Sequence, residues 1–141
     1  MALVIREAHP ASDTKKLNEE WFLLENSGAS AISTGGLQVI SARKGKRGSL
    51  LGTIDPGFML QPGEKIIVCS GVPGKKAHGE PPEREGLRVY HLLQREPLLA
   101  SDGITIRLCM NQFEVTRVTF DRASPTGVAA PAAPATPAAS T

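Results

Sequence analysis

Four basic residues within a stretch of five are the side chains best suited to binding a ligand: Arg43, Lys44, Lys46 and Arg47. No carboxylate interrupts this stretch, so it can bind phosphate groups or an acidic protein surface. A cluster of this kind also keeps an exposed strand edge charged and unpaired. The neighbouring sequence lacks the interleaved aromatic residues on which single-stranded bases stack. We therefore treat nucleic-acid binding through this loop as the alternative function, beside a solvated loop and an acidic protein partner.

Catalytic motifs are missing from the sequence. The three histidines, His9, His78 and His91, are spaced irregularly and form no zinc-ligand pair such as H-E-x-x-H. Gly71–Lys76 holds glycines and lysines, but Pro73 removes an amide donor, and no helix is expected to follow. The sequence therefore predicts a protein that is not an enzyme, with no cofactor, no metal and no small-molecule substrate. A hydrolase hidden in the loops would require His78 or His91 within about 3 Å of a nucleophile or carboxylate.

The charge balance and the apolar runs exclude further classes of protein. Sixteen basic and 14 acidic residues give a net charge of +2, which favours no polyanionic partner. No apolar run approaches the roughly 18–20 residues that cross a bilayer, and the N-terminus lacks the features of a secretory signal. We expect a cytoplasmic protein with no membrane partner. Cys69 and Cys109 belong to no C-x-x-C pair, so two separate reduced thiols are expected.

The elements that must position these residues are predicted to be β-strands. Eleven prolines and 14 glycines divide the chain into short apolar runs, which is typical of an all-β sandwich or barrel. Within Ile104–Leu108 the aliphatic side chains alternate with Thr and Arg, as the period of a strand requires. Lys65–Cys69 is apolar on both faces, which indicates a central strand. The expected strands are Leu3–Glu7, Glu20–Asn26, Leu37–Ala42, Gly48–Ile54, Glu64–Ser70, Leu87–Leu93, Gly103–Met110 and Glu114–Asp121.

Turn residues separate these strands. Asn26-Ser27-Gly28 can hydrogen-bond its own backbone, and Gln61-Pro62-Gly63-Glu64 fits a type II turn with glycine at the position of positive φ. Met110–Phe113 is expected to close the last hairpin. Gly71–Gly86 is expected to be a long loop and the least ordered part of the body.

The composition changes abruptly after Arg122. Residues 123–141 contain only Ala, Pro, Ser, Thr, Gly and Val, a mixture that buries too little surface to offset the entropy of ordering. The sequence thus predicts one domain over residues 1–122 and a disordered tail over residues 123–141.

The order of the strands and turns resembles the lamin tail domain, an immunoglobulin-like module found in nuclear lamins and in bacterial proteins. Glu20–Gly28 is similar to that family's aromatic strand and its Asn turn, and Gly35–Ile40 to its glycine-led strand. Phe58–Val68 and Gly103–Phe120 are similar to its Pro-Gly turn with central strand and to its closing hairpin. The family usually has Trp where this chain has Leu37.

This resemblance implies an immunoglobulin-like sandwich of two antiparallel sheets without catalytic residues. Members of the family act as interaction or scaffolding modules. No heptad repeat precedes the module here, so the likeness is to the bacterial, stand-alone type and not to a lamin. The leading expectation is a non-enzymatic module that binds another protein, or a second copy of itself, through an exposed sheet edge.

Overall fold

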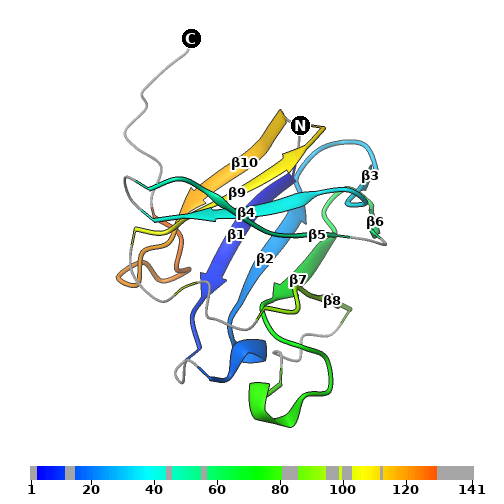
Figure 1. Ribbon diagram of the computed structural model, residues 1–141. Helices are drawn as coiled ribbons and strands as arrows, with labels where there is room; N and C mark the ends of the chain where they lie inside the picture. Colours follow the sequence, from blue (N-terminus) through cyan, green and yellow to red (C-terminus); the bar gives the residue numbers. More distant parts are fainter. Residues whose placement is uncertain are drawn as a thin grey trace.

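The computed structural model is an all-β sandwich, as the sequence predicts (Figure 1). It describes residues 3–11, 15–43, 46–54, 57–80, 86–94, 99, 103–111 and 113–129. One sheet has the strand order β1-β2-β7-β8, the other β10-β9-β4-β5, and β3 pairs with β6 in a small ladder. The strands of the described residues are β1 (Leu3–His9), β2 (Trp21–Asn26), β3 (Ile32–Ser33), β4 (Gln38–Ala42), β5 (Ser49–Thr53), β6 (Met59–Leu60), β7 (Lys65–Cys69), β8 (Arg88–His91), β9 (Thr105–Met110) and β10 (Phe113–Thr119).

Each of the eight predicted runs overlaps one of these strands, with ends that differ by a few residues. The sequence reasoning missed β3 and β6, because two residues are too few to show alternation. It also missed two 3₁₀ helices, η1 (Leu17–Glu19) and η2 (Lys76–His78), which lie side by side at one end of the sandwich (Figure 1). No helix in the described part of the chain is long and apolar enough to cross a membrane.

The core lies between the two sheets and is built from alternate residues of their strands. Ile106 and Leu108 on β9 face Ile66 and Val68 on β7, and Phe22 packs among them. Leu37, at the position where the lamin tail family has Trp, is also fully buried there. Each of these aliphatic side chains stabilises the fold by about 1.5–3 kcal/mol when it leaves water.

The central position predicted for Lys65–Cys69 is confirmed. β7 lies between β2 and β8, with Ile66 and Val68 in the main core. Its other face, Ile67 and Cys69, packs in a second cluster with Trp21. One pairing differs from the expected antiparallel sheets, because β8 runs parallel to β7. The long connection from β7 to β8 is what allows this crossover, which a tight hairpin loop cannot make.

The predicted turns have the expected geometry. Gly63 has a φ of +84°, and the N–H of Glu64 donates to the carbonyl of Gln61 at 2.9 Å. The side chain of Asn26 accepts the N–H of Gly28 at 2.9 Å. The β9–β10 hairpin lacks glycine and uses Asn111 at a φ of +51° instead, since Asn tolerates this region better than most residues.

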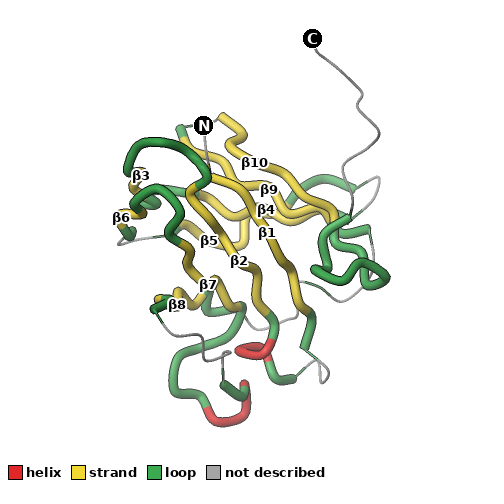
Figure 2. Tube along the Cα trace, turned by 180° about the vertical axis from the view of Figure 1, so that it is seen from behind, coloured by secondary structure: helices red, strands yellow, loops and turns green. Residues whose placement is uncertain are grey.

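The ordered body extends beyond the predicted boundary at Arg122. Residues 123–129 turn back, and Val128 pairs with Phe120 at the end of β10 (Figure 2). The N–H of Ala8 on β1 donates to the carbonyl of Thr126 at 2.8 Å. Composition alone misplaced this boundary, because main-chain hydrogen bonds hold small residues as well as large ones. The rest of the predicted tail, 130–141, lies outside the described residues.

Gly127 provides a test of this extension. Its φ is +80°, and a Cβ atom there would overlap the main-chain oxygen of Ala8. Gly63 has a similar φ of +84°, yet a Cβ atom there would contact nothing. We expect Gly63→Ala to lower the free energy of unfolding by about 1 kcal/mol through φ alone. Gly127→Ala should lower the free energy of unfolding by at least about 2 kcal/mol, because the overlap with Ala8 adds to the backbone strain at positive φ. Urea denaturation measures both, and equal losses would contradict the docking of residues 123–129 on β1.

Candidate functional site

The basic loop lies where the sequence places it, between β4 and β5. Arg43, Lys46 and Arg47 are exposed, and the N–H of Lys46 donates to the carbonyl of Arg43 at 2.9 Å in a turn. Lys44, the fourth predicted binding residue, lies outside the described residues.

Two arginines that the sequence reasoning did not select complete a basic groove with this loop. Arg107 on β9 and Arg117 on β10 stand directly opposite each other, as do Thr105 and Thr119. They line the outer face of their sheet beside the loop and enclose a volume of about 540 Å³. We call this the basic groove; its lining residues are Ala42, Arg43, Lys46, Gly48, Gly103, Thr105, Arg107, Arg117 and Thr119. No carboxylate and no aromatic residue is among these described residues.

Glu114 holds the two arginines from one side. Its Oε1 accepts from Nη2 of Arg117 at 2.7 Å and from its Nε at 3.0 Å. Nε of Arg107 lies 3.2 Å from the same oxygen, within ion-pair distance but without hydrogen-bond geometry. One carboxylate thus orders two guanidinium groups and neutralises one of their charges. Because Arg117 stays 55% exposed and Arg107 34%, both can still meet a ligand.

A second groove lies at the open side of the sandwich, between β1 and β10. These strands belong to different sheets and lie next to each other without a ladder between them in the described chain. The volume between them is about 650 Å³. We call it the edge groove; its lining residues are Val4, Ile5, Arg6, Thr116, Arg117, Val118, Thr119, Ser124, Thr126, Val128 and Ala129. Arg117 and Thr119 line both grooves, which therefore adjoin across β10.

The chain already adds main-chain hydrogen bonds at one end of the edge groove. Ala129 donates its N–H to the carbonyl of Thr119 on β10 at 2.9 Å, and Thr126 accepts from Ala8 on β1. In an antiparallel ladder the main-chain groups of alternate residues point the same way. The main-chain N–H and C=O of Arg117 therefore point toward the edge groove, as the corresponding groups of Thr119 do.

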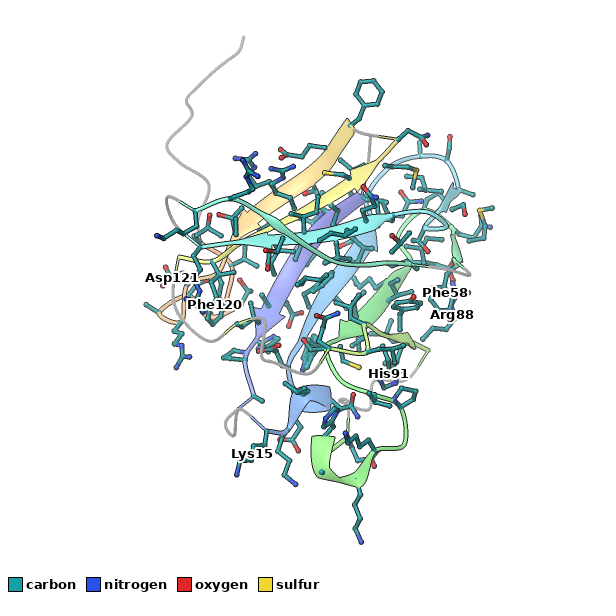
Figure 3. The ribbon with its side chains drawn as sticks, in the orientation of Figure 1. Lys15, Phe58, Arg88, His91, Phe120 and Asp121 are labelled. Carbon is teal, nitrogen blue, oxygen red and sulfur yellow. The ribbon has the colours of Figure 1, made fainter. Side chains whose placement is uncertain are left out.

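The other open side of the sandwich, between β5 and β8, is joined by side chains. The hydroxyl of Tyr90 donates to the carbonyl of Thr53 at 3.1 Å, and Nε2 of Gln94 donates to that of Leu51 at 2.6 Å. These bonds use carbonyls of the edge strand β5. At one end of β8, the guanidinium of Arg88 also lies 4.8 Å from the ring centre of Phe58 (Figure 3). This side is thus less suited to an added strand than the edge groove.

His91 meets the distance that a hydrolase would require between a histidine and a nucleophile. Its Nδ1 lies 3.1 Å from Sγ of Cys69 and 3.1 Å from Oδ1 of Asn18 (Figure 3). The parallel register of β7 and β8 creates this contact by placing Cys69 opposite His91. Both neighbours share one ring nitrogen, so Asn18 does not orient the ring from its other nitrogen as a catalytic relay requires.

The electrostatics of this cluster also disfavour a nucleophile. Burial raises the pKa of the Cys69 thiol to about 12, and burial lowers the pKa of His91. Both groups are therefore neutral near pH 7, where a catalytic Cys–His pair needs a thiolate. Both cysteines are free and buried. In the described part of the chain, no group of three or more His, Cys, Asp or Glu side chains could hold a metal ion.

Asn18 and His78 instead hold the long loop in place. Nδ2 of Asn18 donates to the carbonyls of Val72 at 2.9 Å and Gly79 at 3.2 Å. His78 is buried, and its Nδ1 accepts the N–H of Val72 at 3.1 Å. Hydrogen bonds therefore anchor the first half of this loop at Val72 and Gly79, while residues 73–77 between them are exposed. Residues 81–85 lie outside the described residues. No local pattern around Asn18 signalled this role.

No protein-family model matches the chain, and no curated protein matches it either. The resemblance to the lamin tail domain therefore stays a prediction from the sequence.

Proposed function

We propose that this protein is a non-enzymatic interaction module that binds a strand of another protein at the edge of β10 that faces away from β9. The sequence favours protein binding through a sheet edge, and the contacts of residues 126–129 support the choice of β10 as that edge. The observation that carries the proposal is the pair of main-chain hydrogen bonds that residues 126–129 make with β1 and β10. An added strand would extend the same pattern along the edge groove, where main-chain bonds give affinity and side-chain pockets give specificity.

The contrast between the two open sides supports this choice. At the β5/β8 side, Tyr90 and Gln94 donate to carbonyls of the edge strand. At the β1/β10 side, the main-chain groups of Arg117 point into a groove of about 650 Å³. A strand edge without such a cover is the usual template for pairing with another chain. A second copy of this chain is the self-association form of the same function. The resemblance to a family of scaffolding modules and the expected cytoplasmic location are consistent with it and stay part of the proposal.

Two substitutions at Arg117 test the proposal. Arg117→Pro removes the N–H that points to this edge of β10, and proline is tolerated on that side of an edge strand. Arg117→Gln removes the same charge and keeps the N–H. Each tagged variant, checked for folding by circular dichroism, is used to capture proteins from native lysate. We expect Arg117→Gln to recover the same partner as the unchanged chain with a loss of no more than about 5-fold, the effect of one exposed charge, and Arg117→Pro to recover at least about 10-fold less than Arg117→Gln. Equal recovery by both variants, or no capture by the unchanged chain, would contradict strand addition.

Nucleic-acid binding through Arg43, Lys44, Lys46 and Arg47 is the second candidate. The observation in its favour is that Arg107 and Arg117 extend the basic loop into a groove. Such binding would weaken steeply with salt, by a logarithmic slope of about 0.9 per phosphate contact. The geometry favours it less, because the described lining of the groove holds no aromatic side chain to stack on a base.

A further inference from the structure

The basic groove and the edge groove lie on the two sides of β10. A strand bound in the edge groove would therefore place some of its side chains beside the basic groove. We propose that the bound strand is an extended segment in which acidic residues alternate with apolar ones, its acidic side chains facing the basic groove. This inference rests on the proposed function and names the chemistry of the partner.

Charge is the first argument. The two grooves together present five cationic side chains, Arg6, Arg43, Lys46, Arg107 and Arg117. No carboxylate is among the described residues that line either groove, although two carboxylates outside them offset part of this charge: Glu114 pairs with Arg117 and Glu25 pairs with Arg6 at 2.8 Å. Arginine side chains present paired N–H donors that match a carboxylate. Arg43 and Lys46 would gain carboxylate partners from an acidic strand, and Arg107 and Arg117, which share Glu114, would gain a second one.

The strand period is the second argument. Side chains of a strand alternate between the two faces, so residues i and i+2 share one face and stand roughly 6.6–6.8 Å apart. Arg117 and Thr119 have this spacing on β10, and Arg107 and Thr105 repeat it on β9. An acidic residue opposite Arg117 would form a cross-strand ion pair with it. The position opposite Thr119 is already taken by Ala129, whose N–H donates to the carbonyl of Thr119 at 2.9 Å, so the bound strand would run from Arg117 toward Phe113. The intervening side chains would face Ile5, Val118 and Val128, which are buried or half-buried apolar residues of the edge groove.

The size of the site is the third argument, and it disfavours nucleic acid. Among the described residues the basic groove supplies four cations, fewer than the roughly 6–10 phosphate contacts of a strong nucleic-acid binder. A net charge of +2 for the chain also lies below what such binders usually carry.

Synthetic probes test the inference with the full chain. The probe is a fluorescent octapeptide of alternating Glu and Val. The controls are the Lys and Val octapeptide, which has the same strand period with opposite charge, and an oligothymidine of equal charge. Fluorescence anisotropy at low salt should show that the Glu peptide binds and that added salt weakens it. The other two probes should bind at least about 10-fold more weakly.

Matched variants assign the binding to the groove. We expect Arg107→Gln and Arg43→Gln/Lys46→Gln to weaken the Glu peptide by about 2–5-fold for each charge removed, as for exposed ion pairs. Lys75→Gln/Lys76→Gln removes two exposed charges beside η2 and should change nothing. Equal loss in this control would show a general charge effect and overturn the inference.

The outcomes separate the inference from the proposed function. Suppose that the Lys and Glu peptides bind equally and that Arg117→Pro abolishes the binding of both peptides. Strand addition is then supported, and the inference that the partner is acidic is wrong. If the Glu peptide depends on Arg107 and Lys46 but not on the N–H of Arg117, the acidic partner stands and strand addition is wrong. Binding of oligothymidine with no binding of the Glu peptide would overturn the inference in favour of nucleic acid. No binding of any probe would overturn it as well.

Discussion

Cys69 of the native protein is expected to react with iodoacetamide at pH 8 at least about 100-fold more slowly than the same residue in the unfolded chain. The reagent attacks the thiolate, and burial raises the thiol pKa from 9.0 to about 12. The thiolate fraction at pH 8 is then about 1000-fold smaller in the folded state. A thiolate of higher pKa is the stronger nucleophile, and this raises the labelling rate by roughly 20-fold. The full burial of Cys69 lowers the labelling rate further, because it excludes the reagent.

A Cys109→Ser background leaves one thiol to follow, because the chain has two cysteines. The rate is measured by mass spectrometry with and without denaturant. The His91→Ala variant serves as the control, since removal of a catalytic base would slow the labelling and removal of a packing partner would speed it. Fast labelling of native Cys69 that depends on His91 would contradict our description of the cluster. It would revive the hydrolase that the sequence left as an alternative.

Phe22→Ala is expected to lower the free energy of unfolding by about 3–5 kcal/mol. Phe22 is 1% exposed and packs in the core between the two sheets. Its truncation leaves a cavity that β-sheets on either side cannot collapse to fill, so lost burial and lost packing add. Since small domains are stable by roughly 5–15 kcal/mol, this one change removes a large share of the total.

Phe113→Ala is the matched control, because it removes the same ring from a residue that is 75% exposed on β10. We expect a change of less than about 0.5 kcal/mol there. Urea denaturation measures both variants, and both curves are fitted with the same dependence of the unfolding free energy on urea concentration. A small loss for Phe22→Ala, or similar losses for the two, would mean that Phe22 is not part of the main core.

Local patterns in the sequence predicted much of the fold. Alternation within Ile104–Leu108 assigned Ile106 to the core and Arg107 to the outer face, and both assignments are confirmed. Pro62-Gly63 predicted its turn, because the need for positive φ is a property of a few neighbouring residues. Signals of this kind act over two to four residues, so they survive in any tertiary setting that keeps the strand or the turn.

The end of the ordered body was predicted less well. Residues 123–129 have the composition of a tail, yet Thr126 hydrogen-bonds to the distant strand β1 and Ala129 to the preceding strand β10. The signal that could have indicated this is Gly127, a residue suited to positive φ and to close backbone contact. Glycine is too common in loops to be read that way without the neighbouring strand in view.

By itself the sequence determined which side chains face the core, where the turns fall and that a basic loop separates two strands. The tertiary structure alone decided which distant residues meet. Arg107 and Arg117 join the basic loop because β9 pairs with both β4 and β10 in one register, and Cys69 meets His91 because β8 runs parallel to β7. The physical reason is that the hydrophobic effect drives burial without direction. Alternation therefore reports burial, while strand order and register depend on contacts across the whole chain.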